Sequence, residues 1–361
     1  MFGRLRFMNN RSTVLACMAL LAFGPALAQT DSKDKTAVTF EELYDEPYSI
    51  NKFFVGIQPL YGEVFATNVN AGFGMEASYY YKDKMDFRAH FRKTYSSSFF
   101  DLSRDLAKHT SGPGLKVQPE IFNYYELGAT YHWKDFESDG KTTMVLYKSN
   151  YKGSRWASRV PQRAEVPCKV RKIYGARLGT IIWNSTTELK GTLKKQGLSN
   201  ADLKNAEGVG LPINYTDANG VVRDFNVFGN IYSAGIYSGA SISWFRNVAV
   251  SFDKFDSSID DGMLTLYFDI QYAPFLKMDP VTYTDPNTKI QSDYSTKALK
   301  MTPIGFRAGL DGKFNRQLSW AYGGEMGLRP SLKGRMFYFM FKLTFPIFGT
   351  NLDYKVESFG K

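Results

Sequence analysis

Hydrophobic and polar side chains alternate along the segment 335–345, which reads R-M-F-Y-F-M-F-K-L-T-F. Every second residue is apolar and mostly aromatic: Phe337, Phe339, Phe341, Leu343 and Phe345. The intervening positions are mixed: Met336, Tyr338, Met340, Lys342 and Thr344. Because successive side chains of a β-strand point to opposite faces of the sheet, this pattern predicts a strand with one face of phenylalanine. That face packs either against a second protein layer or against lipid.

The same alternation with a period of two recurs through most of the chain. The clearest segments are 72–81, 87–92, 125–134, 174–182, 264–272, 304–310 and 320–329. Weaker candidates are 53–65, 142–149, 229–245 and 247–255. Several run about ten residues or more, which suits tilted membrane strands better than the five or six residues typical of globular proteins. The pattern predicts about twelve strands, with ten to fourteen compatible, and bacterial barrels close with an even number.

The two faces of these strands differ in chemistry. One face is apolar, and aromatic residues such as Tyr125, Trp133, Trp320 and Tyr322 often stand near its ends, as the interfacial girdles of membrane barrels require. The other face mixes Gly, Ser and Thr with single charges. A soluble β-sandwich would bury the bulky face and expose the charged one, so periodicity alone does not separate the two folds. Strand length and aromatic ends favour an all-β, transmembrane antiparallel β-barrel over 51–348.

The N-terminus has the features of a secretory signal peptide. Residues 1–11 are basic without any acid, an apolar run follows at 14–23, and A-L-A ends at Ala28. This order predicts export with cleavage after Ala28, so that 1–28 is the signal peptide. Cys17 leaves a lipoprotein interpretation open, although it lies inside the apolar run and not after it.

Export determines how the mature chain could meet a membrane. The polar and acidic residues 29–50 are predicted to form a flexible periplasmic lead-in, and 349–361 a C-terminal tail. No segment after the leader offers the roughly 20 consecutive apolar residues of a transmembrane helix. A closed barrel is then the form that satisfies every backbone group inside a bilayer.

The links between the predicted strands are of two kinds. Short turns rich in Gly, Asp and Asn are predicted at 82–84, 138–141 and 311–315. Long links are predicted at 97–121, 150–167, 185–226 and 275–298, with a short helix within 187–203. In bacterial barrels short turns face the periplasm and long loops face outside. Counting strands places 185–226 on the periplasmic side, against that rule, so either a strand is missed or this segment is a periplasmic extension.

Composition narrows the chemistry that the chain can support. Aromatic residues make up 16% of the chain, which favours strands because aromatic side chains fit a pleated surface. With 3 His and 2 Cys, of which Cys168 would be the lone mature thiol, there is little material for a metal centre or a disulfide framework. The net charge of +10 is spread among acids and not massed with stacking aromatics. We therefore expect no metal, no cofactor and no nucleic-acid partner.

The chain resembles Gram-negative outer-membrane β-barrel proteins. The resemblance is carried by the leader ending A-L-A, the alternating strands through 52–348 and the aromatic last strand at 335–345. It implies an outer-membrane location, contact with outer-membrane lipid and lipopolysaccharide, and insertion by the barrel-assembly machinery, which reads the final strand. In that class the chain often ends on an aromatic residue, whereas this one continues beyond Phe348 to Lys361. The resemblance is to an architecture and implies no activity.

Charges on the mixed face would line the lumen of such a barrel. The lumen-facing candidates are Arg88, Arg92, Glu126, Lys134, Arg171, Arg177, Asp269, Arg307, Glu325, Arg329 and Lys342, together with Glu76. Basic residues outnumber acidic ones in this set, and a positive lumen would concentrate anions. The sequence therefore predicts a passive, porin-like channel for small solutes, anions included. The alternative is that the charges pair across the lumen and fill it, because an unpaired buried charge is costly.

Two other functions stay open. Long loops such as N-Y-K-G-S-R-W-A-S-R at 150–159 carry aromatic and Arg residues that could dock a partner, so a non-conducting barrel in an envelope secretion or motility assembly is the first alternative. The same loop could instead touch lipopolysaccharide phosphates. The second alternative is a lipid hydrolase, because His109-Thr110-Ser111 has the His–Ser spacing of such barrels. The pair lies in a loop-like region, however, and the sequence indicates no group that orients the ring, so we expect no enzymatic site.

Overall fold

The computed structural model describes residues 39–50, 52–146, 162–217, 219–253, 255–315 and 320–349. The predicted signal peptide 1–28, the loop 150–159 and all but the first residue of the tail 349–361 lie outside the described residues. The elements below belong to one compact unit, Phe40–Lys361.

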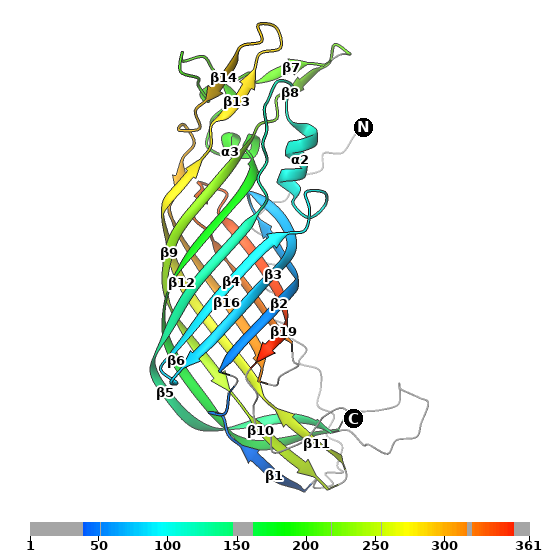
Figure 1. The fold of residues 1–361 in the computed structure, drawn as a ribbon, viewed down its shortest axis with the longest axis vertical. Helices are drawn as coiled ribbons and strands as arrows, with labels where there is room; N and C mark the ends of the chain where they lie inside the picture. Colours follow the sequence, from blue (N-terminus) through cyan, green and yellow to red (C-terminus); the bar gives the residue numbers. More distant parts are fainter. Residues whose placement is uncertain are drawn as a thin grey trace, which may run out of the picture. The chain divides into compact units, whose positions relative to one another are not determined.

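Ten antiparallel strands form a closed barrel (Figure 1). In chain order they are β2 (Phe53–Phe65), β3 (Asn68–Tyr81), β4 (Met85–Thr94), β5 (Asn123–Leu146), β6 (Gln162–Glu188), β9 (Phe228–Phe245), β12 (Gly262–Met278), β16 (Ile304–Phe314), β17 (Ala321–Leu328) and β19 (Phe337–Gly349). Each pairs with the next in this order, and β19 pairs with β2 to close the cylinder. The predicted all-β antiparallel barrel is confirmed, with a strand number at the lower bound of the predicted range instead of twelve.

Two of the predicted strands do not add to the barrel. The segments 125–134 and 142–149 are not a hairpin, because β5 continues straight through the predicted turn 138–141. The reason is that β6 supplies backbone partners along this stretch, with Asp139 opposite Lys169. The candidate 247–255 contains β10 (Val248–Phe252), which belongs to a separate three-stranded sheet.

Turn chemistry was interpreted correctly at one short link and wrongly at another. At 82–84, Lys82 and Asp83 both have positive φ, of 48° and 55°, and Lys84 N–H bonds to the carbonyl of Tyr81. Two successive positive φ values with this hydrogen bond are the geometry of a type I′ turn, which is common in tight β-hairpins. The predicted turn 311–315 is instead strand as far as Phe314.

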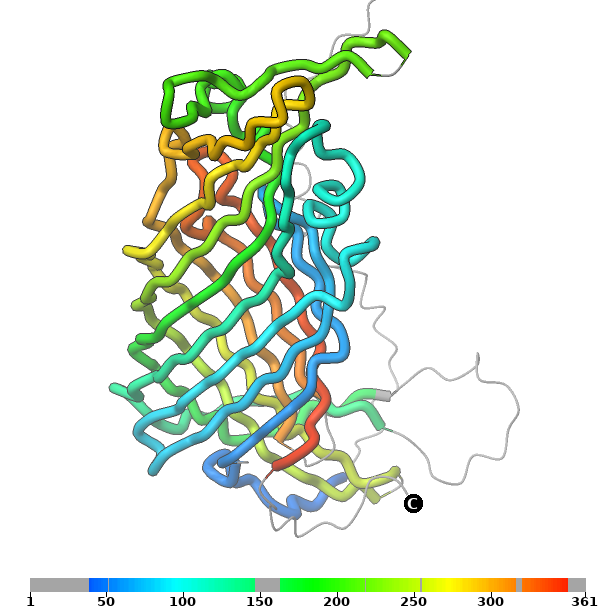
Figure 2. Tube along the Cα trace, turned by 45° about the horizontal axis from the view of Figure 1, so that its top comes forward, coloured from blue at the N-terminus to red at the C-terminus, as the bar shows by residue number. Residues whose placement is uncertain are grey.

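Three of the predicted long links, 97–121, 185–226 and 275–298, gather at one end of the barrel, which we call the cap end (Figure 1). In the fourth, predicted at 150–167, residues 162–167 are instead part of strand β6. The elements of the cap end are α2 (Leu102–Thr110), α3 (Lys190–Lys195), η2 (Asn200–Asp202), β7 (Asn214–Thr216), β8 (Val222–Asp224), β13 (Val281–Thr284), β14 (Gln291–Tyr294), β15 (Met301–Thr302) and β18 (Ser331–Leu332). Figure 2 shows the green and yellow parts of these links lying over the barrel strands. The link 185–226 is among them, so the strand count that placed it on the side opposite to the other long links was wrong. Counting 125–149 as two strands had inverted the direction of the predicted strands from there to 229–245.

The opposite end, the base end, carries the tight turn at 82–84 and a small sheet. That sheet has the order β1-β10-β11, with β1 at Phe40–Asp45 and β11 at Phe255–Asp260. Residues Phe40–Asp45 therefore form a strand within the segment that was predicted to be a flexible lead-in. Among the described residues, no helix is long and apolar enough to cross a membrane.

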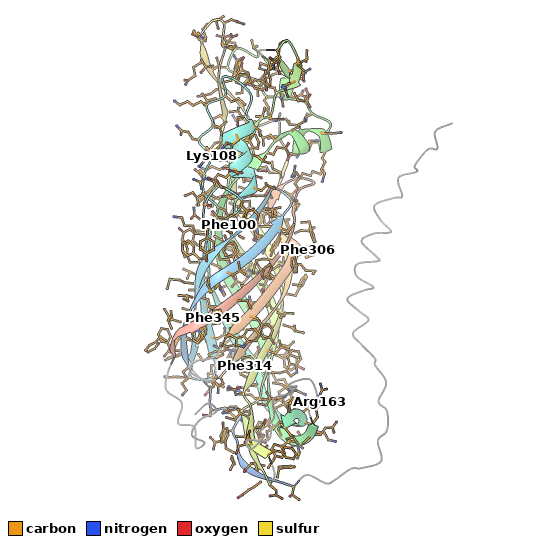
Figure 3. The ribbon with its side chains drawn as sticks, turned by 90° about the vertical axis from the view of Figure 1, so that its right-hand side faces the viewer. Phe100, Lys108, Arg163, Phe306, Phe314 and Phe345 are labelled. Carbon is orange, nitrogen blue, oxygen red and sulfur yellow. The ribbon has the colours of Figure 1, made fainter. Side chains whose placement is uncertain are left out.

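The apolar face of each barrel strand points outward. On β19, Phe337, Phe339, Phe341 and Phe345 are each 40–54% exposed, while Tyr338 is buried inside the barrel. Phe306 and Phe345, labelled in Figure 3, stand on this outer wall. Within the described part of the chain, no second protein layer covers the bulky face, and the mixed face fills the interior. This arrangement is the reverse of a soluble sandwich.

Candidate functional site in the barrel interior and the cap

Most of the predicted lumen-facing charges meet inside the barrel. Those that lie in the interior are Arg88, Arg92, Glu126, Arg177, Asp269, Arg307, Glu325, Arg329 and Lys342, with Glu76 beside them. Arg171 is also buried, but it lies at the base end, where its guanidinium bonds to Asp135 at 2.5 Å.

Lys134 is the predicted lumen residue that the structure places elsewhere. It is exposed, and its Nζ lies 4.8 Å from the ring centre of Phe136. The pairing of β5 with β6 shifts by one residue between His132 and Lys134. A β-bulge of this kind inserts one extra residue and so reverses the inward and outward positions that follow. His132 is the last inward residue before it.

Arg307 occupies the centre of the interior. Its Nη2 donates to Glu126 Oε1 at 2.6 Å, its Nε to Asp269 Oδ2 at 2.8 Å and its Nη1 to Glu325 Oε2 at 3.2 Å. Arg177 Nε donates to the other oxygen of Asp269 at 2.9 Å. One guanidinium thus joins strands β5, β12, β16 and β17 across the lumen.

A second buried pair lies beside this centre. Arg329 forms two parallel hydrogen bonds with Glu63, at 2.7 and 3.0 Å, and Asn70 donates to Glu63 at 3.1 Å. Such bidentate contacts between Arg and a carboxylate are among the stronger hydrogen bonds of proteins. Arg92 lies 3.6 Å from Glu325, within ion-pair range but beyond a hydrogen bond.

A third set of pairs lies on the base side. Lys342 Nζ is 2.7 Å from Glu76 and 3.1 Å from Asp311. Arg88 bonds to Asp86 at 2.9 Å and to Asp311 at 3.2 Å. Several of these side chains line a cavity of about 40 Å³, which is room for a very few water molecules.

The interior charges balance, and we call them together the ionic layer. The cations are Arg88, Arg92, Arg177, Arg307, Lys313, Arg329 and Lys342. The carboxylates are Glu63, Glu76, Asp86, Glu126, Asp269, Asp311 and Glu325. These are seven of each, so the expected positive lumen is not formed.

Sequence reasoning missed three of the carboxylates, Glu63, Asp86 and Asp311, and the cation Lys313. The alternation with a period of two could have identified each of them as an inward-facing residue. Asp86 is in phase with Arg88, for example, while Asp311 follows in phase from Arg307 and was assigned to a turn instead.

Glycines on the inner face make room for large side chains. A methyl group added at Gly128 or Gly179 would collide with the ring or hydroxyl of Tyr237, and one added at Gly309 would collide with Tyr267. The guanidinium of Arg307 lies 4.5 Å from the ring centre of Tyr237. Rings facing glycines therefore complete the filling of the lumen around the ionic layer.

Toward the cap end the filling changes to aromatic rings, which we call the aromatic layer. Its members are Tyr61, Phe65, Tyr124, Trp183 and Tyr338, each at most 2% exposed. Phe65 packs edge-on against Trp183 and Tyr338, with ring centres 5.4 and 6.3 Å apart. The guanidinium of Arg329 lies 4.2 Å from the ring centre of Tyr338 and so joins the two layers.

The aromatic layer continues without a break into the core of the cap. The same cluster contains Leu189, Leu193, Leu203, Leu211, Phe225, Val227, Tyr283 and Leu332. All of them are buried, and they come from links far apart in sequence. The cap is therefore a folded body packed on the mouth of the barrel.

Asp101 fixes α2 to the barrel rim. It accepts hydrogen bonds from the side chain of Asn68 at 2.8 Å and from the backbone N–H of Phe122 at 3.2 Å. Burial raises the pKa of Asp101 above its usual value, while these two donors pull the pKa in the opposite direction.

The candidate hydrolase pair lies on α2 and its C-terminal cap, which corrects the prediction of a loop. His109 Nδ1 is 3.4 Å from Asp105 Oδ1, and the Ser111 hydroxyl donates to the carbonyl of Ala107. Within the described chain, no hydrogen bond joins His109 to Ser111. No group of three or more His, Cys, Asp or Glu among the described residues is arranged to hold a metal.

Comparison with known proteins adds little to this geometry. No protein-family model matches the chain, and no curated protein matches it. Among solved structures, the chain is similar to the toluene transporter TbuX of Ralstonia pickettii, at 9% identity and a TM-score of 0.24, over 82% of this chain and 88% of that one. A TM-score of this size supports no inference about activity, and the barrel assignment rests on the strand pairing itself.

Proposed function

We propose that the protein is an outer-membrane β-barrel that does not conduct solutes in this conformation. Its role would be structural or partner-docking, with the barrel holding the folded cap at the cell surface. The observation that carries this proposal is the filled interior, in which the ionic layer and the aromatic layer follow each other across the lumen. A barrel of ten strands is narrow enough for side chains to fill it.

Two features support the orientation in the membrane. The outward face of the strands is apolar, as contact with acyl chains requires. The links 97–121, 185–226 and 275–298 lie at the cap end, whereas the tight turn at 82–84 lies at the base end (Figure 1). In bacterial barrels this places the cap outside the cell and the base in the periplasm.

Conductance in a planar bilayer tests the proposal directly. The purified full-length barrel is expected to give no steps above baseline, while a porin in the same bilayer provides the positive control. Heat-modifiable migration on a gel confirms that the sample is a folded barrel. Reproducible steps from the folded protein would overturn the proposal.

A second candidate is the passive channel for small solutes, anions included. The cavity on the base side favours it, because charged side chains there already surround space for water. In this alternative, a conformational change would have to separate the aromatic layer. Conductance that appears only after truncation of that layer, for example in Trp183→Gly, would identify the aromatic layer as a closed gate.

An enzymatic role is not part of the proposal, because the Ser111 hydroxyl donates to a backbone carbonyl and not to His109. Lipid hydrolysis by the wild type that is lost in Ser111→Ala would contradict this.

A docking role for the cap is supported by its exposed apolar side chains. Val209, Ile213, Val222 and Ile290 are 52–66% exposed on the links farthest from the barrel. Purification in mild detergent is expected to retain a stoichiometric envelope partner, and the double variant Val222→Asp and Ile290→Asp is expected to lose it.

A further inference from the structure

A strip of aromatic rings runs from the outer barrel wall toward α2. Phe91 packs on Phe73, and Phe73 on Tyr95, with ring centres 6.4 and 5.5 Å apart. Tyr95 packs on Phe100, and Phe100 on Phe99, at 5.5 and 5.2 Å. The strip therefore extends the apolar outer surface of the barrel beyond the ends of its strands.

The helix α2 continues this surface on one face. Leu102 and Leu106, one helical turn apart, are 45% and 38% exposed. Ser103 and Ala107 lie about 100° further around the helix and are buried. The Ser103 hydroxyl donates to the carbonyl of Thr67 at the barrel rim. In a soluble helix the leucines would be expected to face the core, because residues four apart share one face.

Phe99 has an exposed side chain and a strained backbone conformation. Its side chain is 87% exposed, more than any other large apolar side chain described. Its φ is +69°, in the left-handed region that costs an ordinary L-residue about 1–2 kcal/mol. Glycine would occupy this position without strain, so the ring itself is the property that the position supplies.

One cation lies within this apolar surface and another on its cap side. Lys93 is an outward position of β4 directly across from Phe73, and Lys108 is exposed in the last turn of α2. Figure 3 places Phe100 near the rim of the barrel wall and Lys108 farther toward the cap. From the wall toward the cap, apolar and aromatic side chains are therefore followed by Lys108, while Lys93 lies level with Phe73 on the wall. This is the order in which a side chain leaving a bilayer meets acyl chains, interface and phosphates.

We propose that residues 95–108 form a lipid anchor, with Phe99, Leu102 and Leu106 inserted at the acyl-chain boundary and Lys108 against lipid phosphates. The occupant is the phosphorylated glycolipid of the leaflet at the cap end, with lipid A as its membrane-embedded part. Continuity with the lipid-facing wall identifies this occupant in preference to a protein. The proposal rests on the outer-membrane location proposed above.

Quenching by brominated acyl chains tests the depth of the anchor. Single cysteines are introduced at Phe99, Phe306 and Ile290 in a Cys168→Ala background, labelled with a small fluorophore, and reconstituted in brominated phosphatidylcholine vesicles. Phe306 lies on the barrel wall and Ile290 at the tip of the cap, so they serve as inserted and exposed references. We expect at least twofold more quenching at position 99 than at position 290.

The three positions separate two kinds of failure. If position 306 is quenched but 99 is quenched no more than 290, the anchor is disproved and the barrel's membrane location stands; a protein would then be the remaining occupant of this face. If position 306 is not quenched either, the proposed membrane location itself fails, and the anchor fails with it.

Phe99→Gly provides a test that folding defects cannot imitate. It removes the ring and relieves the strain, so thermal stability in detergent is expected to stay unchanged or rise. The additional stability gained on transfer to nanodiscs containing lipid A is expected to fall. Ile290→Ala is the matched control and should alter neither. Loss of stability in detergent with an intact gain in nanodiscs would overturn the proposal.

The cationic part of the anchor is tested separately. Titration of lipid A into the detergent-solubilised full-length protein at low salt should show at least threefold weaker binding for Lys108→Ala. Lys300→Ala, another exposed lysine of the cap, should bind as the wild type does. Equal affinities for Lys108→Ala and the wild type would contradict the assignment of the phosphate contact.

Discussion

The ionic layer and the aromatic layer fill the same cylinder by different means. In the ionic layer, most cations form an ion pair with a carboxylate from another strand, as Arg307 does with Glu126 at 2.6 Å. In the aromatic layer, rings such as Phe65 and Trp183 pack edge to face and need no partner of opposite charge. Charge pairs are directional and costly to leave incomplete, whereas rings lose only contact area and packing. The ionic layer therefore fixes which strands face each other, and the aromatic layer seals the mouth and carries the cap.

The largest loss of stability is predicted for removal of Arg307, the central cation of the ionic layer. Arg307→Ala leaves Glu126, Asp269 and Glu325 without it and is expected to destabilise the barrel by about 4 kcal/mol. Urea unfolding in detergent, followed by heat-modifiable migration, measures this. Arg163→Ala, an exposed arginine of β6 labelled in Figure 3, should stay within about 0.5 kcal/mol. Equal effects of the two variants would remove the special role of the ionic layer.

A cavity in the core of the cap should cause a smaller loss of stability than Arg307→Ala, and the loss should be confined to the cap. Leu203 is fully buried in the cluster that joins cap and aromatic layer, so Leu203→Ala is expected to cost about 3 kcal/mol. The loss should appear as early unfolding of the cap, seen in Trp fluorescence, while the heat-modifiable barrel persists. Val222→Ala on the exposed hairpin is the control. Simultaneous loss of barrel and cap would show that the two do not unfold separately.

A third prediction concerns the close contact between an inner-face glycine and the aromatic ring that faces it inside the barrel. Gly128→Ala would press its methyl group on the Tyr237 hydroxyl and is expected to destabilise by about 2 kcal/mol. Tyr237→Phe removes that hydroxyl, so the double variant should recover part of the loss. Strictly additive effects of the two changes would mean that the contact is relaxed by movement of the ring.

The smallest predicted effect is the pH dependence of stability that Asp101 contributes where the cap meets the barrel rim. Because the folded-state pKa of Asp101 is raised, its contribution to stability is present at low pH and lost as the pH rises through that pKa. The stability of the wild type relative to Asp101→Asn should therefore increase as the pH falls from about 7 to about 4. The change is at most about 1.4 kcal/mol for each unit by which the pKa is raised. A decrease over the same range would contradict the sign.

Much of the architecture followed from the period-two pattern, and the errors have physical causes. The segment 138–141 has turn chemistry, yet it lies in β5 because β6 runs beside it and satisfies its backbone groups. Lys134 left the predicted face because a bulge shifts the phase after His132. Neither the neighbouring strand nor the bulge can be recognised from the local sequence of these residues.

The candidate site was predictable only in part. Alternation placed Arg307, Asp269 and Glu126 on inward faces, but it said nothing of their mutual distances. Glu126 and Arg307 are 181 residues apart in sequence and meet only when the barrel closes. The choice between an open positive lumen and a filled one depended on that closure.

The sequence by itself determined which side chains of each strand face outward and which face inward, because the orientation of successive side chains is a local property of the extended backbone. It also determined that the outward face is apolar. Only the tertiary structure decided how many strands close the cylinder, which charges meet inside it, and that the links 97–121, 185–226 and 275–298 share one end. These features depend on pairings between distant segments, where closure distances and the need to neutralise buried charges select one arrangement.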